Sequence, residues 1–288
     1  MEQIQNNRVI TDLYRENAQF PGIALDGSDV YLCWQRFVDR HDSLMASCRR
    51  GDEVVWEREI SDGGEVLHPV ILAHGGAIWY AWSEYARENW RILARYYRDG
   101  RWGEVLTVAS GEALFFPRLF TWQGRLHVIW TEQHKGSAAA VLCPLTEAGP
   151  GAAETVSAVG EAYRAGAAEG GDGNLYVAYD GFDGKQYKLF ARARTAAGWS
   201  EEIVVSQGED WASTPWIAAK LDGAVVGWYD YGYMAVYSVR SADLTVRDGA
   251  LTAVNPQCLK EGVDWYLDLH VASNSSGLQA MAYTRSKY

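Results

Sequence analysis

The sequence predicts an all-β fold, a six-bladed β-propeller with repeats of about 48 residues. The first observation is a column of aromatic residues at intervals of 48, 48, 49, 49 and 55: Trp34, Trp82, Trp130, Tyr179, Trp228 and Tyr283. The second is a proline thirteen residues before four of them: Pro21, Pro69, Pro117 and Pro215. The third is the composition, since 13 Trp, 17 Tyr and 7 Phe favour strands, and no stretch keeps a helical period. Units of about 40 to 50 residues with four strands each are typical of propeller blades.

The second repeat illustrates the order of elements within a unit. Its apolar runs predict four antiparallel strands at residues 70–73, 78–82, 91–97 and 105–108. Residues 83–89, between the second and third strands, are mostly polar, so we expect a loop there. The interval of 55 before the last aromatic predicts a loop of six or seven extra residues between positions 241 and 264.

The repeats predict a single domain over residues 1–288, closed into a ring. Five residues follow Tyr283, so the last blade lacks its outer strand at that end. Residues 9–12 end nine residues before Pro21, as residues 105–108 end nine before Pro117, and this spacing predicts that the N-terminal segment supplies the missing strand. We expect blades at approximately residues 20–61, 68–108, 116–158, 164–206, 213–255 and 264–288, the last completed by residues 8–12.

Charge and cysteine content limit the partners and the compartment. The 26 basic and 37 acidic side chains give a net charge of −11, which repels a phosphate backbone, so no nucleic acid is expected. No apolar run approaches the roughly 18 residues of a membrane span, and the first residues lack a signal-peptide pattern. The four scattered cysteines are expected to be free thiols. These features predict a cytoplasmic protein without a membrane partner; a processed secreted form is the alternative, and the oligomeric state is left open.

One rim of the propeller collects the start of every inner strand and the end of every second strand. Just beyond the aromatic column, successive blades place charged side chains there: Arg36, Glu84, Glu132, Asp180, Asp230 and Arg285. Such a mouth, acidic on one side and basic on the other, suits a polar ligand with several hydroxyls, and nearby aromatic rings could stack on a sugar. The ligand-binding candidates, including those beside the proline positions, are Arg36, His68, Arg118, Arg164, Asp180, Trp216, Tyr231 and Arg285.

Three carboxylates of this rim are candidates for acid/base chemistry: Glu84, Glu132 and Asp230. A glycosidase needs two carboxyl groups about 5 Å apart for retention or about 6.5 to 9.5 Å apart for inversion, and Glu84 and Glu132 stand on adjacent blades. The same side chains could hold a divalent cation through oxygen ligands, but the histidines have no metal-site spacing, and we expect no cofactor. The alternative for the rim is an ordinary solvated surface, and for the aromatic column it is packing between blades.

The turns after the third strands carry a resemblance to a known family. Residues 98–102 read RDGRW, residues 197–200 read AGWS and residues 46–52 read ASCRRGD. With these turns the chain resembles the sialidase-like six-bladed propellers with BNR repeats, although no full Asp box is present. More distantly it is similar to the six-bladed fucose-binding lectins, whose repeats share the length and a DG-x-W turn.

The resemblance to sialidases implies a carboxylate held by arginines, a tyrosine nucleophile and an aspartate acid/base. The residues that it offers for these roles are Arg118, Arg164 and Arg285 for the carboxylate, and Tyr229 or Tyr231 for the nucleophile. The arginine that the family has before the first blade's proline is absent, because residues 19–21 read QFP.

Three functional hypotheses follow. The first is a carbohydrate-related propeller that binds a glycan or small polar ligand at the mouth of the central channel. The second is a glycoside hydrolase or lyase that acts on a carboxylated sugar. The third is a protein-interaction scaffold with an inert rim. Convergence of the rim side chains around a pocket favours the first two.

Overall fold

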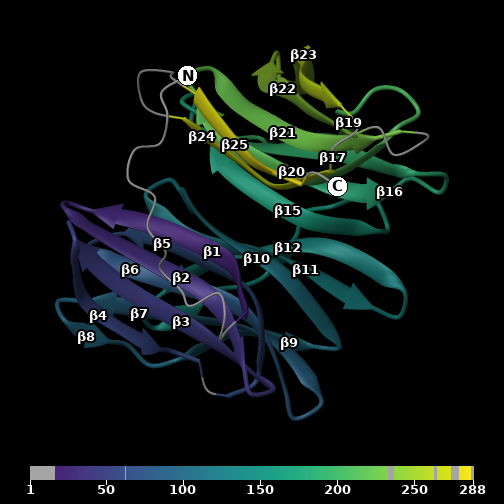
Figure 1. Cartoon of the computed structure of the whole chain (residues 1–288). Helices are drawn as coiled ribbons and strands as arrows, with labels where there is room; N and C mark the ends of the chain where they lie inside the picture. Colours follow the sequence, from purple (N-terminus) through teal and green to yellow (C-terminus); the bar gives the residue numbers. More distant parts are fainter. Residues whose placement is uncertain (1–16, 62, 233–236, 263–264, 274–278, 287–288) are drawn as a thin grey trace.

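The structure, a computed structural model, describes residues 17–61, 63–232, 237–262, 265–273 and 279–286; from residue 262 onward it describes the backbone alone. The described chain is all-β and forms six antiparallel sheets, numbered here 1 to 6 in chain order (Figure 1). Five sheets have four or five strands, and sheet 6 has two.

Sheets 1 to 3 form the first half of the molecule, and the first four strands of each follow the chain order from the innermost strand outward. The fifth strand of sheets 2 and 3 pairs with the third strand, as the fourth does. Sheet 1 contains β1 (Asn17–Asp26), β2 (Asp29–Val38), β3 (His41–Arg50) and β4 (Glu53–Glu59). Sheet 2 contains β5 (Glu65–His74), β6 (Ala77–Ala86), β7 (Asn89–Arg98), β8 (Arg101–Trp102) and β9 (Leu106–Gly111). Sheet 3 contains β10 (Ala113–Trp122), β11 (Arg125–His134), β12 (Ser137–Thr146), β13 (Gly149–Pro150) and β14 (Glu154–Thr155).

Sheets 4 to 6 repeat this order. Sheet 4 contains β15 (Ala162–Glu169), β16 (Leu175–Phe182), β17 (Tyr187–Thr195), β18 (Gly198–Trp199) and β19 (Ile203–Val204). Sheet 5 contains β20 (Trp211–Lys220), β21 (Gly223–Tyr231), β22 (Tyr237–Arg247) and β23 (Ala250–Gly262). Sheet 6 contains β24 (Trp265–Ser273) and β25 (Gln279–Ser286).

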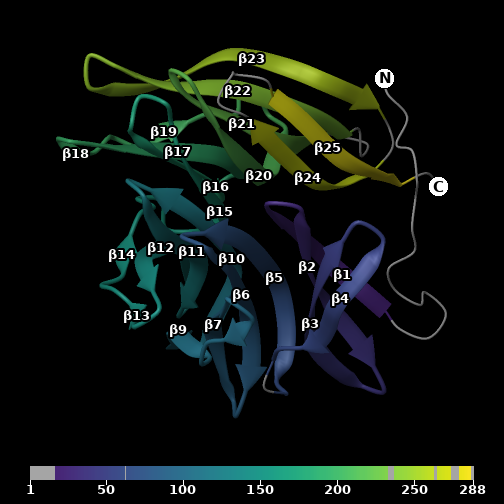
Figure 2. The same cartoon turned by 90° about the vertical axis from the view of Figure 1, so that its left-hand side faces the viewer.

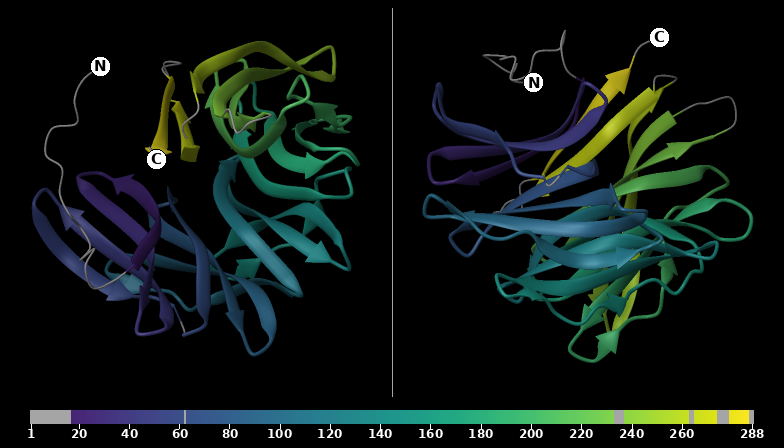
Figure 3. Two further views of the ribbon diagram at one scale, coloured as in Figure 1. Left: turned by 45° about the vertical axis from the view of Figure 1, so that its right-hand side comes forward. Right: turned by 90° about the horizontal axis from the view of Figure 1, so that it is seen from below.

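The sheets are arranged like the blades of a propeller. The innermost strands contact one another in the order β1, β5, β10, β15, β20 and β24, and the sheets fan outward from them (Figures 2 and 3). This confirms an all-β, propeller-like fold. Six blades in a closed ring stay a prediction, because the proposed closing segment, residues 8–12, lies outside the described residues.

The aromatic column packs between neighbouring sheets. Trp82 is fully buried against Tyr31 and Leu44 of sheet 1, and Trp130 is buried against Trp79 and Ile92 of sheet 2. A large aromatic ring removes about 150–250 Å² from water, about 4–6 kcal/mol as an upper estimate. The interpretation of the column as blade-to-blade packing is therefore confirmed for Trp82 and Trp130, and Tyr179 and Trp228 likewise belong to clusters that span two sheets. The side chain of Tyr283 lies outside the described residues.

Two expected loops are wrong. Residues 83–89 are mostly strand, because β6 continues to Ala86, β7 begins at Asn89, and a two-residue turn joins them. Arg87 and Glu88 form this turn with φ of 52° and 66°, a tight hairpin without the glycine or asparagine that usually announces it. The extra residues after position 241 lengthen the β22–β23 hairpin rather than form a loop.

Candidate functional site

A β-bulge interrupts the inner strand of sheets 1 to 5 at the same place, just before the proline position. The bulged residue has a left-handed backbone in every case, with φ between 41° and 55°: Phe20, His68, Phe116, Arg164 and Thr214. Such a conformation is costly for a residue with a side chain, and a bulge re-aims the side chain that it carries. Five equivalent bulges on one rim therefore make this rim the candidate functional site.

The bulged side chains of sheets 1 to 4 contact one another in sequence. The rings of Phe20 and His68 lie 4.9 Å apart, and those of His68 and Phe116 lie 4.2 Å apart. The Arg164 guanidinium lies 6.0 Å from the centre of the Phe116 ring. The bulges have thus turned these side chains toward their neighbours along the ring of inner strands.

His68 is neutral in this arrangement. Burial between two phenyl rings, and then the positive charges of Arg118 and Arg164, lower the pKa of its imidazole to about 4. Its Nδ1 is buried and has no hydrogen-bond partner in the described part of the chain. A neutral imidazole beside two arginines can accept or donate a hydrogen bond without adding a third positive charge.

Arg164 is held in place by Asp180. Its Nε lies 2.9 and 3.1 Å from the two carboxylate oxygens, and its Nη2 also contacts Oδ2. Asp180 is fully buried, whereas about a third of the Arg164 side chain remains accessible. A guanidinium that is paired on one side retains further donors for a ligand carboxylate or hydroxyl.

The channel below this rim contains a cavity of about 700 Å³, lined by residues of β1, β5, β10, β15 and β20. Arg118 of β10 and Trp216 of β20 both line it, and the Arg118 guanidinium lies 4.1 Å from the centre of the Trp216 ring. This cation–π contact links strands from two non-adjacent sheets. A second cavity, of about 560 Å³, is lined by the opposite ends of the inner strands.

Glu84 and Asp230 are bound within their own sheets. Glu84 is fully buried, accepts a hydrogen bond of 3.1 Å from Trp82 Nε1, and pairs with Arg91 at 2.5 Å. Asp230, 2% exposed, repeats this arrangement, with Trp228 Nε1 at 2.7 Å and Arg240 at 2.5 Å. Burial raises the pKa of Asp230 to about 6, although the Trp228 hydrogen bond and Arg240 oppose this.

Glu132 stands at the corresponding position of sheet 3 without such partners. Ala139 occupies the cross-strand position that Arg91 has in sheet 2, and Trp130 Nε1 has no acceptor among the described residues. Glu132 is half-buried and lines a cavity of about 280 Å³ together with His134 and Ser137. No hydrogen bond or ion pair joins Glu84, Glu132 and Asp230 to one another within the described residues.

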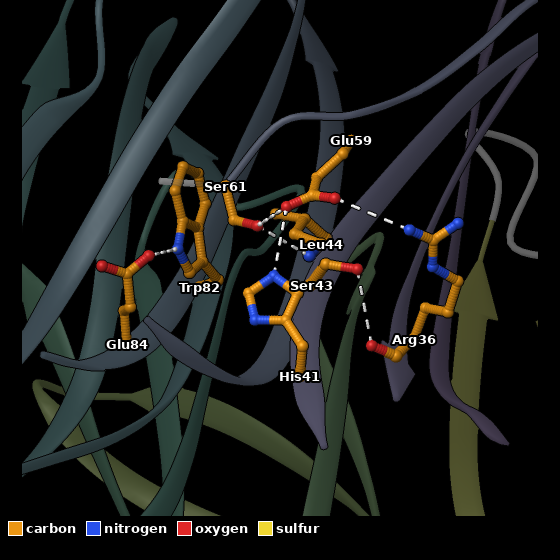
Figure 4. Close-up of polar contacts among 8 residues, drawn as sticks. All are labelled: Arg36, His41, Ser43, Leu44, Glu59, Ser61, Trp82 and Glu84. Atoms are coloured by element: carbon orange, nitrogen blue, oxygen red, sulfur yellow. Dashed lines mark hydrogen bonds and ion pairs between the residues drawn. The ribbon is translucent and has the colours of Figure 1, made fainter. Parts of the chain in front are cut away.

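Arg36 belongs to a separate polar group in sheet 1 (Figure 4). Its guanidinium lies 3.5 Å from Glu59, which also lies 3.6 Å from His41. Arg285 is on β25, but its side chain is outside the described residues.

The structure brings five of the sequence-based candidates into two contact groups on this rim. Arg164 pairs with Asp180 and shares the Phe116 ring with His68, and Arg118 stacks on Trp216. The charges of Arg118 and Arg164 both act on His68, and the charge of Arg164 acts on Tyr231. Arg36, Glu84 and Glu132 lie outside these groups, each in different surroundings. Asp230 lies in sheet 5 with Arg240 and is influenced by the charges of Asp210 and Lys188.

A cation at the acidic rim finds no support in this geometry. Within the described ranges, no three His, Cys, Asp or Glu side chains are grouped so that they could hold a metal ion.

In the same part of the chain, no helix is long and apolar enough to cross a membrane. Cys33, Cys48, Cys143 and Cys258 are free thiols.

Sequence reasoning named Tyr231 as a candidate but missed that it belongs to a second aromatic column on the rim. It lies three residues after the first, at the end of each second strand: Phe37, Tyr85, Phe182 and Tyr231, with Gln133 in sheet 3. Unlike the first column, it is accessible, with Phe37 43% and Tyr85 36% exposed. Its period in the sequence could have revealed it, because the offset of three residues from the buried column is constant.

No family model matches the chain, and no curated protein matches it. Solved structures do match. One described as "NanB plus Optactamide" has a TM-score of 0.63 and 7% identity over 93% of this chain and 65% of the other. A subtype N10 neuraminidase-like protein of A/little yellow-shouldered bat/Guatemala/060/2010 has a TM-score of 0.61 and 8% identity over 95% of both chains. A puromycin-hydrolyzing peptidase of Mycobacterium tuberculosis has a TM-score of 0.53 and 17% identity over 93% of this chain and 42% of the other. At such identities the similarity shows the fold alone.

Proposed function

We propose that this protein is a carbohydrate-related β-propeller that binds a glycan or a small polar ligand at the mouth of the central channel. The observation that carries the proposal is that His68 and Arg164 both contact the Phe116 ring, on the same rim as a cavity of about 700 Å³ that Arg118 lines. Asp180 fixes Arg164, and Trp216 and Tyr231 add ring faces, so charged donors and aromatic surfaces occur together as sugar recognition requires. A neuraminidase-like protein shares the fold, which supports the same class.

The test is a glycan array with neutral and carboxylated glycans, followed by titration calorimetry of the glycans that bind. Removing Arg164 alone would strand the buried Asp180 charge, so the variant is the double substitution Arg164→Ala with Asp180→Ala. The control is Arg194→Ala with Glu154→Ala, an ion pair away from the mouth whose arginine is similarly exposed, 32% against 34%, although its carboxylate is 38% exposed and Asp180 is buried. We expect the first pair to weaken binding at least about tenfold and the control to leave it unchanged. Equal binding by both would overturn the site.

A glycoside hydrolase or lyase of sialidase-like type is the second candidate, favoured by the raised pKa of Asp230. A carboxyl group with a pKa near 6 can donate a proton close to neutral pH, which general acid catalysis needs. Asp230→Asn should then reduce release of reducing sugar from an array-positive glycan by about 100-fold or more. Full turnover in Asp230→Asn, Glu84→Gln and Glu132→Gln would exclude all three proposed acid/base groups. Failure of every glycan to bind would favour the protein-interaction scaffold.

We further propose that the ring has six blades and that residues 8–12 complete the sixth as its outer strand. The two-stranded sheet 6 supports this, because an inner pair of strands leaves an edge that needs a partner. Deleting residues 1–12 should lower the Tm by several degrees, and an unchanged Tm would contradict the closure.

We also propose a reducing, cytoplasmic location, which the free cysteines support. Subcellular fractionation can test this proposal, and recovery of the protein outside the cytoplasm would contradict it.

A further inference from the structure

A continuous row of aromatic side chains runs along the rim of sheets 4 and 5, and we call it the aromatic arc. Neighbouring ring centres are 5.4 to 6.1 Å apart throughout. It begins with Tyr163 and Phe182, which both neighbour Tyr187, and continues through Trp211, Tyr231 and Tyr237. The step from Tyr187 to Trp211, at 5.6 Å, crosses from sheet 4 to sheet 5, so the arc spans both.

The strand register sets the spacing of these rings. Trp211 lies directly opposite Tyr231, Tyr231 lies opposite Tyr237, and Phe182 lies opposite Tyr187. Residues opposite each other in an antiparallel pair project on the same face, with their Cβ atoms about 4.5–5.5 Å apart. A surface built on paired strands is already ordered, so a ligand does not have to order it on binding.

Trp211 does not have the environment of a core tryptophan. It is 41% exposed, whereas Trp82 and Trp228 of the packing column are 0% and 2% exposed. The other rings of the arc are half-buried. Packing between sheets therefore explains the burial of the first aromatic column. Trp211 does not belong to that column and keeps an accessible face.

The arc adjoins Arg164 on β15, because Tyr163 directly precedes Arg164 and lies opposite Asp180, the partner of Arg164. The charge of Arg164 also acts on Tyr231. Four of the six rings are tyrosines, so the row carries polar hydroxyl groups as well as aromatic ring faces. A lipid chain would need an unbroken apolar surface, which these hydroxyls and the guanidinium interrupt. A polyanion would be repelled by the net charge of −11.

We propose that the aromatic arc is a second subsite, which binds the further rings of an oligosaccharide whose first ring occupies the mouth. This inference rests on the proposed function. A sugar ring has an apolar C–H face and a polar edge, which matches a row of aromatic faces flanked by hydroxyl groups. Trp211 supplies the stacking surface with the largest exposure, and affinity should therefore rise with chain length.

The experiment compares single sugars with their tetrasaccharides by titration calorimetry, using xylose, arabinose, galactose and galacturonic acid. In the wild-type protein, a tetrasaccharide should bind at least about tenfold more tightly than its monosaccharide. Trp211→Ala should remove roughly three- to tenfold of that gain and leave monosaccharide binding unchanged, because an aromatic contact contributes about 0.5–1.5 kcal/mol. Trp211→Phe should restore part of the gain, since it keeps a ring.

The matched control is Phe37→Ala. Phe37 occupies the rim position of sheet 1 that corresponds to Tyr231 and has nearly the same exposure as Trp211, 43% against 41%, but is not part of the arc. Two results would overturn the subsite but leave the mouth intact. One is an equal loss of the chain-length gain in Phe37→Ala and Trp211→Ala, and the other is the absence of any such gain in the wild type. If none of these sugars binds the wild-type protein, both the subsite and the proposed function fail.

Discussion

Glu84 in sheet 2 and Glu132 in sheet 3 occupy the same position of the repeat but have different surroundings. Glu84 is fully buried between Trp82 and Arg91, whereas Glu132 faces Ala139 and lines a small cavity. The residue across the strand pair decides the difference, because it either supplies or withholds a counter-charge. A shared repeat position therefore fixes where a side chain lies. The residue opposite it on the next strand decides whether that side chain is paired within the sheet or is available to a ligand.

The largest expected effect is on the stability of sheet 2. Glu84→Ala should lower the free energy of unfolding by about 4 kcal/mol, because it strands Arg91, leaves Trp82 Nε1 without its acceptor and opens space in a buried site. Glu132→Ala should cost less than about 0.5 kcal/mol. Urea denaturation of both variants measures this, and similar losses would refute the contrast.

Asp230 extends the comparison to sheet 5, where the same tryptophan–carboxylate–arginine arrangement carries a raised pKa. Its folded-state pKa is about 6 against 3.8 in the unfolded chain, so protonation favours the folded state. The stabilisation is complete below pH 3.8 and is lost as the pH rises through 6, about 3 kcal/mol in all. Asp230→Asn should therefore gain about 2.4 kcal/mol relative to the wild type between pH 4 and pH 7, because part of the stabilisation is already lost at pH 4. Parallel stability curves over this range would contradict the raised pKa.

His68, on the inner strand of sheet 2, should show the opposite dependence. Its folded-state pKa is about 4 against 6.5 for an unperturbed imidazole, so the folded state resists protonation. The stability is present above pH 6.5 and is lost as the pH falls toward 4. Discounting for its partial exposure, we expect a loss of about 2 kcal/mol. His68→Phe should lack this loss in denaturant titrations at pH 7 and pH 4.5, and an identical loss in both proteins would argue against it.

The smallest expected effect comes from giving sheet 3 the partner that it lacks. Ala139→Arg places a guanidinium opposite Glu132, as Arg91 stands opposite Glu84. The new ion pair should contribute about 0.5–1 kcal/mol because both groups remain partly exposed. A double-mutant cycle with Glu132→Gln isolates this coupling, and a coupling of zero would show that the cross-strand position is not sufficient.

The repeat made much of the fold predictable. The pattern predicted that each aromatic side chain of the column packs between neighbouring sheets, and Trp82 and Trp130 are buried in this way. The ends of the strands were harder to predict, because Arg87 and Glu88 adopt positive φ angles in a turn that contains no glycine. The site was predictable in part: His68, Arg118 and Arg164 were named from their place beside the proline positions. The contacts of His68 and Arg164 with Phe116 depend on bulges that no local sequence pattern predicts.

The sequence by itself determined the period, the all-β class and the residues that each unit carries to the rim, because strand alternation and repeat length follow from local composition. Tertiary structure decided which of those residues act together. The left-handed bulges turned Phe20, His68, Phe116 and Arg164 toward one another, and cross-strand register gave Glu84 an arginine and Glu132 an alanine. Contacts of this kind join residues of different strands and sheets, so their distances are set by how the sheets pair and pack and not by spacing along the chain.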